Sequence, residues 1–318
     1  MKISIVTLNY NGSESTIKLL KSLRNQTDND FRIIVVDNAS EGADFNNLRA
    51  YSDNNFSDVQ IIRNSQNLGF SGGNNTGAKE ALKNGANWVF LLNNDTWVEP
   101  GFMASLKAKI GGLGGVAGVP LVEQGKAGYP ARSRMSYCGR VKWLKPRGYH
   151  VHDLDTKRKM RNEECYVIGG AMLIHGSVLE KIGLLDENYF LYFEDNDFSL
   201  RAQRAGFPIT ILEEPAVYHQ PSSTAKKLGP SLLLRYHYRN SFYFNWKNGP
   251  WYIKILVWPW SLWVMKKQLL KITLGYKKEE SQAILSGVFD WYKNKMGQVV
   301  NFSDAQSAMP KATEKSTT

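Results

Sequence analysis

The sequence predicts an α/β fold in which a mostly parallel sheet carries helices on both of its faces. Short apolar runs, rich in β-branched residues, alternate with helical patterns along the first third of the chain. Parallel neighbours need a crossover between them, so this alternation is typical of a parallel sheet with crossover helices. The strongest runs also end in Asn or Asp, and ligands of open α/β sheets gather at the carboxyl ends of the strands.

Four strands and two helices make up the alternation. Ile17, Leu20 and Leu23 repeat at a helical spacing after the first strand, and a second helix is expected at residues 78–84. The strands are expected at residues 3–8, 31–36, 59–62 and 88–92.

Residues 67–77 precede the second helix and are rich in Gly and Asn. We expect a loop whose backbone can approach a ligand closely, followed by a helix N-terminus that suits an anion. The glycine spacing matches neither a P-loop nor a dinucleotide-binding fingerprint. A flexible loop without a ligand is the alternative.

The strand at residues 88–92 is apolar throughout, which predicts burial on both faces, and Asn93, Asn94 and Asp95 follow it. A carboxylate in this position can hold a cation against a phosphate. An ordinary Asn/Asp turn explains the same residues. Taken by itself, the stretch leaves both interpretations open.

Length and composition indicate one large domain with an appendage, because 318 residues with 42% hydrophobic residues can bury a sizeable core. The two cysteines, Cys138 and Cys165, cannot form a disulfide framework, and no Cys/His cluster has the spacing of a zinc site. The N-terminal residues lack the apolar core of a secretory signal. We therefore expect a cytoplasmic protein.

The positive charge is concentrated in the last third of the chain. The net charge is +11, and residues 221–318 hold 15 Lys and Arg against 5 Asp and Glu, together with six of the nine Trp. Lysine mixed with tryptophan fits an anionic membrane surface. Nucleic acid is not expected as a partner, because no module that places side chains on bases is present.

Residues 251–265 are the most apolar segment of this tail, but Lys254 interrupts them and Lys266 and Lys267 close them. A spanning helix needs about 20 predominantly apolar residues. An in-plane or re-entrant anchor is therefore favoured. The alternative is a helix packed on the main domain or on a second copy of the chain, which would be a homo-oligomer.

Seven segments, taken in order, resemble family 2 glycosyltransferases of the GT-A fold, in particular the bacterial rhamnosyltransferase-like members. They are residues 6–11, 35–40, 67–77, 91–95, 169–173, 190–198 and 217–219. The resemblance covers roughly residues 3–245. It implies a Rossmann-like nucleotide-diphospho-sugar transferase that moves a sugar from a nucleotide-sugar donor with inversion.

The resemblance also implies a donor site at the strand ends and the glycine-rich run. The implied nucleotide-sugar-binding residues are Thr7, Asn9, Asp37, Asn67, Gly69, Asn74, Asn75 and Asn94.

A divalent metal, Mn²⁺ or Mg²⁺, is implied at Asp95, which occupies the position of the family's metal-binding aspartate. Asn93 and Asn94 are neutral where many relatives carry Asp, so the ion should be held weakly until the donor phosphates arrive. His219 matches a histidine that can complete the metal shell, and an imidazole ligand favours manganese. A histidine bonded to backbone at a strand end explains His219 equally well.

Glu194, Asp195 and Asp197 follow an aromatic run and open a helix expected at residues 197–205. Acids at a helix N-terminus complement the dipole, which accounts for Asp197. An inverting transfer needs a carboxylate that takes the proton of the acceptor hydroxyl. By resemblance this catalytic base is Asp195, Glu194 orients the acceptor or the base, and Gly169 and Gly170 lie against the sugar and the acceptor.

The sequence therefore predicts a GT-A catalytic domain at residues 1–245, a basic, Trp-rich membrane-associating tail at 246–300 and a disordered end at 301–318. We expect an enzyme peripheral on the cytosolic face of the inner membrane. It would transfer a sugar, with rhamnose from dTDP-rhamnose as the first guess, to a saccharide or polyprenyl-linked acceptor for a cell-surface polysaccharide. A nucleotidyltransferase and a non-catalytic sugar-nucleotide-binding relative are the alternatives.

Overall fold

The main sheet of the computed structural model, which describes residues 1–56, 58–123, 134–160, 165–220 and 228–299, has the strand order β13-β6-β12-β4-β1-β2-β3. The strands are β1 (Ile3–Asn9), β2 (Arg32–Asp37), β3 (Val59–Arg63), β4 (Trp88–Leu92), β6 (Val116–Gly118), β12 (Ala171–His175) and β13 (Ile209–Ile211). Strand β12 runs antiparallel to β4 and β6, and the other pairs are parallel. The predicted α/β fold with a mostly parallel sheet is confirmed, and the four expected strands form one half of the sheet.

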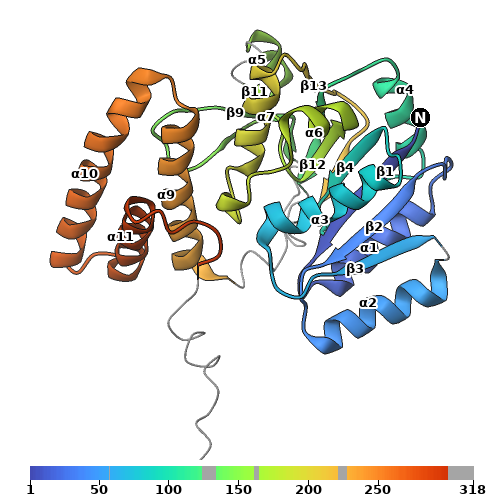
Figure 1. The fold of residues 1–318 in the computed structure, drawn as a ribbon, viewed down its shortest axis with the longest axis horizontal. Helices are drawn as coiled ribbons and strands as arrows, with labels where there is room; N and C mark the ends of the chain where they lie inside the picture. The colour runs from blue at the N-terminus through green and yellow to red at the C-terminus, as the bar shows by residue number, and fades with distance from the viewer. Residues whose placement is uncertain (57, 124–133, 161–164, 221–227, 300–318) are drawn as a thin grey trace, which may run out of the picture.

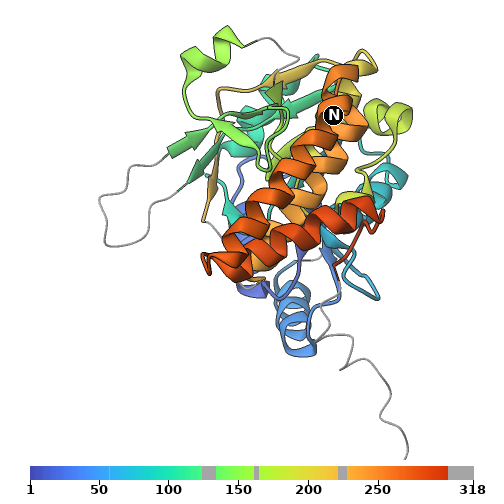
Figure 2. The same cartoon turned by 90° about the vertical axis from the view of Figure 1, so that its left-hand side faces the viewer.

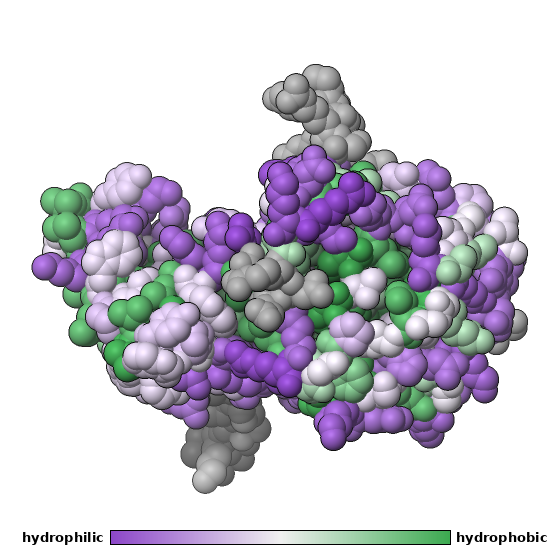
Figure 3. Space-filling model, turned by 90° about the horizontal axis from the view of Figure 1, so that it is seen from above, coloured by the Kyte–Doolittle hydropathy of each residue, from purple (hydrophilic) through white to green (hydrophobic). Residues whose placement is uncertain are grey.

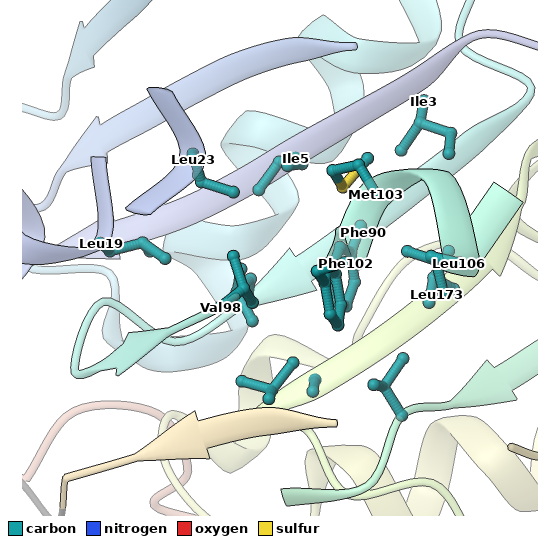
Figure 4. Close-up of a cluster of buried hydrophobic side chains, with 14 of the residues drawn as sticks. Ile3, Ile5, Leu19, Leu23, Phe90, Val98, Phe102, Met103, Leu106 and Leu173 are labelled. Atoms are coloured by element: carbon teal, nitrogen blue, oxygen red, sulfur yellow. The ribbon is translucent and has the colours of Figure 1, made fainter. Parts of the chain in front are cut away.

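Helices cover both faces of this sheet (Figure 1). One face carries α1 (Ser13–Arg24), α2 (Gly42–Asn55) and α4 (Phe102–Ile110); the other carries α3 (Gly69–Lys83), α6 (Gly176–Ile182) and α7 (Glu194–Arg204). Side chains of β4 alternate between the two cores: Phe90 and Leu92 pack with the first set, and Val89 and Leu91 with the second. In the first core, Phe102 stacks on Phe90 with ring centroids 6.1 Å apart (Figure 4).

Helix α3 begins at Gly69, nine residues before the predicted start at Ala78. The expected glycine loop is therefore mostly helix, and this expectation was wrong. Its glycines are required by packing, because a Cβ at Gly73 would lie 2.3 Å from Leu8 Cδ1 and one at Gly77 would lie 2.3 Å from Val6 Cγ1. Close packing on β1 outweighs the low helix propensity of glycine.

Two small sheets extend the main domain. A four-stranded sheet has the order β5 (Thr96–Trp97), β14 (Val217–His219), β7 (Leu121–Glu123) and β8 (Arg134–Ser136), and a three-stranded sheet has the order β10 (Tyr149–Val151), β9 (Cys138–Arg140) and β11 (Cys165–Tyr166). The remaining short helices are α5 (Leu154–Lys159) and the 3₁₀ turn η2 (Glu187–Tyr189). Pairing of β14 with β5 places His219 opposite Thr96, next to the end of β4.

The C-terminal helices form a bundle beside the sheet domain (Figures 1 and 2). They are α9 (Gly229–Asn248), α10 (Trp251–Thr273) and α11 (Lys278–Tyr292). Their own apolar core consists of Phe242, Val257, Val264, Ile284 and Val288. The boundary predicted at residue 245 falls inside the last turn of α9, so the bundle includes a helix that the sequence assigned to the catalytic part. The predicted end at 301–318 lies outside the described residues.

Candidate active site

A pocket opens where β1, β2 and β4 end, at the carboxyl edge of the sheet. Its walls are Leu8, Tyr10, Asn38, Asn67, Gly69, Phe70, Asn93, Asn94, Asp95, Phe190, Leu191 and Leu228. The three strands are parallel, so the residues that follow them meet at one edge although they are far apart in sequence.

Four of the predicted donor and metal residues line this pocket: Asn67, Gly69, Asn94 and Asp95. The sequence reasoning assigned no role to Tyr10, Asn38, Phe190 or Leu191, which also line it. Tyr10 and Asn38 each directly follow a predicted site residue at a strand end, which was the signal that could have identified them.

Thr7, Asn9 and Asp37 lie beneath the pocket and are completely buried. Asn9 Nδ2 donates to Asp37 Oδ1 at 3.0 Å, and Asp37 also pairs with Arg63 at 3.4 Å. Asn9 and Asp37 therefore bind each other across the ends of β1 and β2, whereas Thr7 Oγ1 has no hydrogen-bond partner among the described residues. Here their contacts shape the strand ends that carry the pocket residues.

Asn38 ties the end of β2 to the start of α3. Its Nδ2 donates to Asn67 Oδ1 at 2.8 Å and to Gly69 O at 3.1 Å, while its Oδ1 accepts from Leu68 N at 3.1 Å. Asn38 is 1% exposed. The pocket wall at Asn67 and Gly69 is therefore held by hydrogen bonds that satisfy buried polar groups.

Asn74 and Asn75, both predicted to bind the donor, face the protein interior. Asn75 Nδ2 donates to Leu185 O and to Glu187 Oε1, each at 2.9 Å, and its Oδ1 accepts from Leu185 N at 3.0 Å. Asn74 Nδ2 donates to Phe70 O at 2.9 Å. With both amide hydrogens in use, Asn75 fixes the 185–187 segment against α3.

Asp95 and His219 come together across the β5–β14 pairing. Asp95 Oδ2 lies 3.2 Å from His219 Nε2, and the side chains are 9% and 20% exposed. Burial by itself lowers the pKa of His219, but the hydrogen bond and charge of Asp95, with the charge of Glu123, raise it to a net value above normal. His219 therefore contacts a carboxylate, in contrast to the alternative in which it bonds only to backbone.

This carboxylate and imidazole pair fits a divalent metal that favours oxygen and nitrogen ligands. Among the described residues, no group of three or more His, Cys, Asp and Glu side chains is gathered closely enough to hold an ion. An ion at this pair would have Asp95 of the pocket wall and His219 beside it as protein ligands, and its other ligands would be water or phosphate oxygens. The chemistry of the pair therefore fits an ion shared between protein and substrate.

Glu194 and Asp195 open α7, which begins three residues before the predicted start at Asp197. Asp195 Oδ2 accepts from Gly169 N at 3.0 Å, and its Oδ1 accepts from Asn196 N at 2.8 Å. Burial raises the pKa of Asp195, although these backbone hydrogen bonds oppose the shift. Burial, followed by the neighbouring Asp195 charge, raises the pKa of Glu194 well above its usual range.

Gly169 and Gly170 connect this carboxylate to the pocket. A Cβ at Gly169 would lie 3.4 Å from both Asp195 Cβ and the Phe70 ring, and one at Gly170 would lie 3.3 Å from Asn93 Nδ2. The backbone of these two glycines is therefore the layer between Asp195 and the pocket residues Phe70 and Asn93.

The chain reaches Glu194 through a left-handed turn of aromatic residues. Phe190, Tyr192 and Phe193 have φ values of 58°, 73° and 76°. Such conformations cost of order 1–3 kcal/mol per residue and persist only where the surroundings impose them. The first of them, Phe190, lines the pocket, so one turn links the pocket wall to the two carboxylates.

Asp197 is fully buried and has a structural role. Its Oδ2 pairs with Arg201 Nε at 2.7 Å, and its Oδ1 pairs with Lys247 Nζ at 2.7 Å and accepts from Asn248 Nδ2 at 2.8 Å. These contacts join α7 to α9. Asp197 also lies in the first turn of α7, where no side chain caps the helix by a hydrogen bond.

Residues 4–183 match the family model for Glycosyl transferase family 2. The low-salt glycan biosynthesis hexosyltransferase Agl10 of Haloferax volcanii is 24% identical over 250 residues, which are 76% of this chain and 74% of that protein.

Three solved structures resemble most of the chain. S. aureus TarS residues 1–349 in complex with UDP-GlcNAc aligns with a TM-score of 0.56 and 17% identity, over 92% of this chain and 81% of that one. This chain spans 40% of the longer TarS structure, with a TM-score of 0.53 and 18% identity over 79% of this chain. The Pyrobaculum calidifontis mannosyltransferase PcManGT in complex with GDP-Man and Mn²⁺ aligns with a TM-score of 0.55 and 12% identity, over 92% of this chain and 87% of that one.

Proposed function

Because the chain belongs to glycosyl transferase family 2 and has the GT-A fold, we propose that it transfers one sugar from a nucleotide-sugar donor to a saccharide hydroxyl with inversion. The observation that carries the proposal is the pocket at the strand ends, with Asp195 set behind it on the backbone of Gly169. Family membership establishes a glycosyltransferase. The residue roles that follow are our assignments.

Asp195 acts as the general base in this proposal. It takes the proton of the acceptor hydroxyl while that oxygen bonds to the anomeric carbon and the bond from this carbon to the donor diphosphate breaks. Burial raises the pKa of Asp195 and so makes the carboxylate a stronger base. Glu194, whose pKa burial and the charge of Asp195 raise well above its usual range, would orient the acceptor or the base.

Asp95 and His219 would hold the divalent metal, and Asn67, Gly69 and Asn94 would contact the donor. When bound, the ion supplies charge stabilisation to the departing diphosphate. Manganese is the first ion to test, because imidazole is a better ligand for it than for magnesium. Asn93 and Asn94 contribute no formal charge, which leaves Asp95 as the carboxylate of this trio.

dTDP-rhamnose is the first donor to test, because the sequence segments resemble rhamnosyltransferase-like enzymes. UDP-GlcNAc and GDP-Man belong in the same panel, since the structurally similar TarS and PcManGT bind them. The proposed acceptor is a saccharide or a polyprenyl-linked saccharide used for cell-surface polysaccharide.

The test is an assay for nucleoside diphosphate release with this donor panel, Mn²⁺ and saccharide acceptors. We expect release that depends on both acceptor and metal. Asp195→Asn should lower turnover by about 10²–10⁴-fold while donor binding still raises the melting temperature. The matched control is Asp30→Asn, an exposed aspartate paired with Lys107.

Three outcomes would count against the proposal. Pyrophosphate formed from a nucleoside triphosphate would identify a nucleotidyltransferase. Donor binding without turnover by the unaltered protein would identify a non-catalytic relative. Full activity of Asp195→Asn would remove Asp195 as the base.

We also propose that the bundle attaches the enzyme to an anionic membrane surface, the cytosolic face of the inner membrane. Of 16 exposed large hydrophobic side chains among the described residues, 14 lie between residues 246 and 292. The buried residues of α10 repeat at 253, 257, 261, 264 and 268, which leaves Trp251, Ile255, Leu262 and Trp263 on the opposite, outward side. No helix in the described part of the chain has the length and hydropathy needed to cross a bilayer.

A further inference from the structure

Asn240 of α9 contacts the left-handed turn that leads to Glu194. Its Nδ2 lies 2.7 Å from Tyr189 O, 2.7 Å from Leu191 O and 3.1 Å from Tyr192 O, and the residue is completely buried. An amide nitrogen carries two hydrogens. Two carbonyls therefore receive strong hydrogen bonds, and the third shares one. Tyr189 O also accepts from Leu191 N at 2.6 Å and from Arg239 Nη2 at 3.4 Å.

Arg239 sets the orientation of this amide. Its Nε donates to Asn240 Oδ1 at 2.9 Å, and Arg239 is 1% exposed. A guanidinium has donors and no acceptor, so the amide oxygen must face Arg239 and the amide nitrogen must face the turn. Arg239 is in turn fixed by Lys295 O at 3.3 Å and by the Tyr236 ring at 4.9 Å.

The turn is short and leads directly to the carboxylates. Tyr192 and Phe193, both left-handed, are followed at once by Glu194 and Asp195 in the first turn of α7. Bulky side chains do not favour this backbone conformation. Without the hydrogen bonds of Asn240, the turn would relax and displace the start of α7.

We propose that Asn240, oriented by Arg239, is a positioning residue that holds Glu194 and Asp195 at the pocket through the turn at residues 189–193. The inference rests on the proposed role of Asp195 as the base. It assigns a task in the reaction to α9, the helix on which the rest of the C-terminal bundle is built.

The effect should fall on turnover more than on donor binding. Phe190 O accepts from Phe70 N at 2.6 Å, and the Phe190 ring stacks on Tyr236 with centroids 5.5 Å apart. These contacts anchor the pocket end of the turn without Asn240. The carbonyls of Leu191 and Tyr192, closer to Asp195, have Asn240 as their donor.

Asn245 provides a matched control on the same helix. It is also completely buried, and its amide bonds to Leu144 N at 2.8 Å and to Ser241 O at 2.7 Å. Truncating it also removes buried side-chain hydrogen bonds, one donated and one accepted. Within the described part of the chain, its side-chain hydrogen bonds do not reach the turn at residues 189–193.

The experiment compares kcat and donor KM for Asn240→Ala, Asn240→Asp and Asn245→Ala, well below the melting temperature of each. Asn240→Ala should lower kcat by about 100-fold, the size expected for a misplaced catalytic group, with a donor KM within about threefold. Asn240→Asp keeps the volume but points carboxylate oxygens at carbonyl oxygens, so its kcat should be equally low. Asn245→Ala should keep kcat within about threefold of the unaltered protein.

Equal kcat losses for Asn240→Ala and Asn245→Ala would overturn the inference, and so would nearly full activity of Asn240→Asp. If Asn240→Ala does not fold, the isosteric Asn240→Asp is compared with Asn245→Asp on the same criterion. Activity of Asp195→Asn would instead overturn the proposed function. If Asp195→Asn loses activity but the Asn240 and Asn245 variants lose kcat equally, only the positioning role of Asn240 would be overturned.

Discussion

Glu194 is 6% exposed, and its Oε2 has no hydrogen-bond partner among the described residues. Its pKa is raised above the ordinary value of 4.5, first by burial and then by the charge of Asp195. Below pH 4.5 the folded and unfolded states both carry the proton. As the pH rises the unfolded chain loses its proton first, so stability falls until the pH passes the raised folded-state pKa.

Glu194→Gln should therefore remove part of this decline. We expect the variant and the unaltered protein to be equally stable near pH 4. Above pH 4 the unfolding free energy of the variant should exceed that of the unaltered protein by about 1.4 kcal/mol more for each pH unit, up to the folded-state pKa of Glu194. Denaturant unfolding at a series of pH values measures the difference. Glu180→Gln, at an exposed position, is the control, and parallel curves for the two variants would contradict the prediction.

For single residues, the sequence predicted which segments come together better than it predicted which way each side chain points. The order of the motifs along the chain identified Asp95 and His219 as candidates, and in the structure Asp95 Oδ2 lies 3.2 Å from His219 Nε2. Asn9, Asp37 and Asn75 were chosen by the same reasoning, but they face inward and bind one another or the chain nearby. Which side of a strand end a polar side chain takes depends on partners far away in sequence, and the sequence does not identify those partners.

Among the secondary-structure elements, α3 departs most from its predicted bounds. Helix propensity argues against a helix through Gly72, Gly73 and Gly77. The partners that require glycine, Leu8 and Val6, belong to β1, more than 60 residues earlier. The apolar strands and α1 were predictable because their periodicity is local, whereas the start of α3 is set by packing between elements.

Gly77→Ala tests this explanation. Helix propensity alone would make alanine stabilising by about 1 kcal/mol. The new Cβ would instead lie 2.3 Å from Val6 Cγ1 and 3.0 Å from Val36 Cγ2, both on buried strands. We expect a net loss of about 1–3 kcal/mol of unfolding free energy, the usual cost of overpacking.

Gly42→Ala is the matched control for Gly77→Ala. Gly42 opens α2, and a Cβ there would have no neighbour within 4 Å. This variant should be neutral or gain up to about 1 kcal/mol in chemical denaturation. A gain of similar size in both variants would show that packing does not determine the glycines of α3.

For the whole molecule, the surface of α10 matters most, because it combines exposed apolar side chains with lysines. The outer left edge in Figure 3, where α10 lies, shows hydrophobic surface next to hydrophilic residues. Lys254, Lys266, Lys267 and Lys271 belong to the same helix as the exposed Trp251 and Trp263. Apolar contact with acyl chains and attraction to anionic headgroups would act at one place.

Vesicle flotation tests this attachment. The protein should bind vesicles that contain anionic lipid more tightly than neutral ones, and added salt should weaken the binding. Trp263→Ser, at a side chain 58% exposed, should lower the partition coefficient. The expected size is about tenfold, from the transfer free energy of a large apolar side chain.

Tyr149→Ser is the control for the flotation experiment, because Tyr149 is 40% exposed but lies on β10 and not on α10. Equal losses for Tyr149→Ser and Trp263→Ser would sink the membrane assignment. A concentration-dependent dimer that Trp263→Ser abolishes would assign the outward face of α10 to a second copy instead.

Helix α9 belongs to both halves of the molecule: Asn240 holds the turn before Glu194, and Arg235 pairs with Asp290 of α11 at 2.6 Å. If a ligand in the pocket shifts α9 and so changes the affinity of the bundle for its own ligand, binding at the bundle changes the affinity of the pocket by the same factor. This follows because coupling free energies are reciprocal. Under the proposed function, donor binding in the pocket and binding of the bundle to a membrane surface would form one thermodynamic cycle. Surface affinity measured with and without the donor gives the energy of that coupling without any turnover.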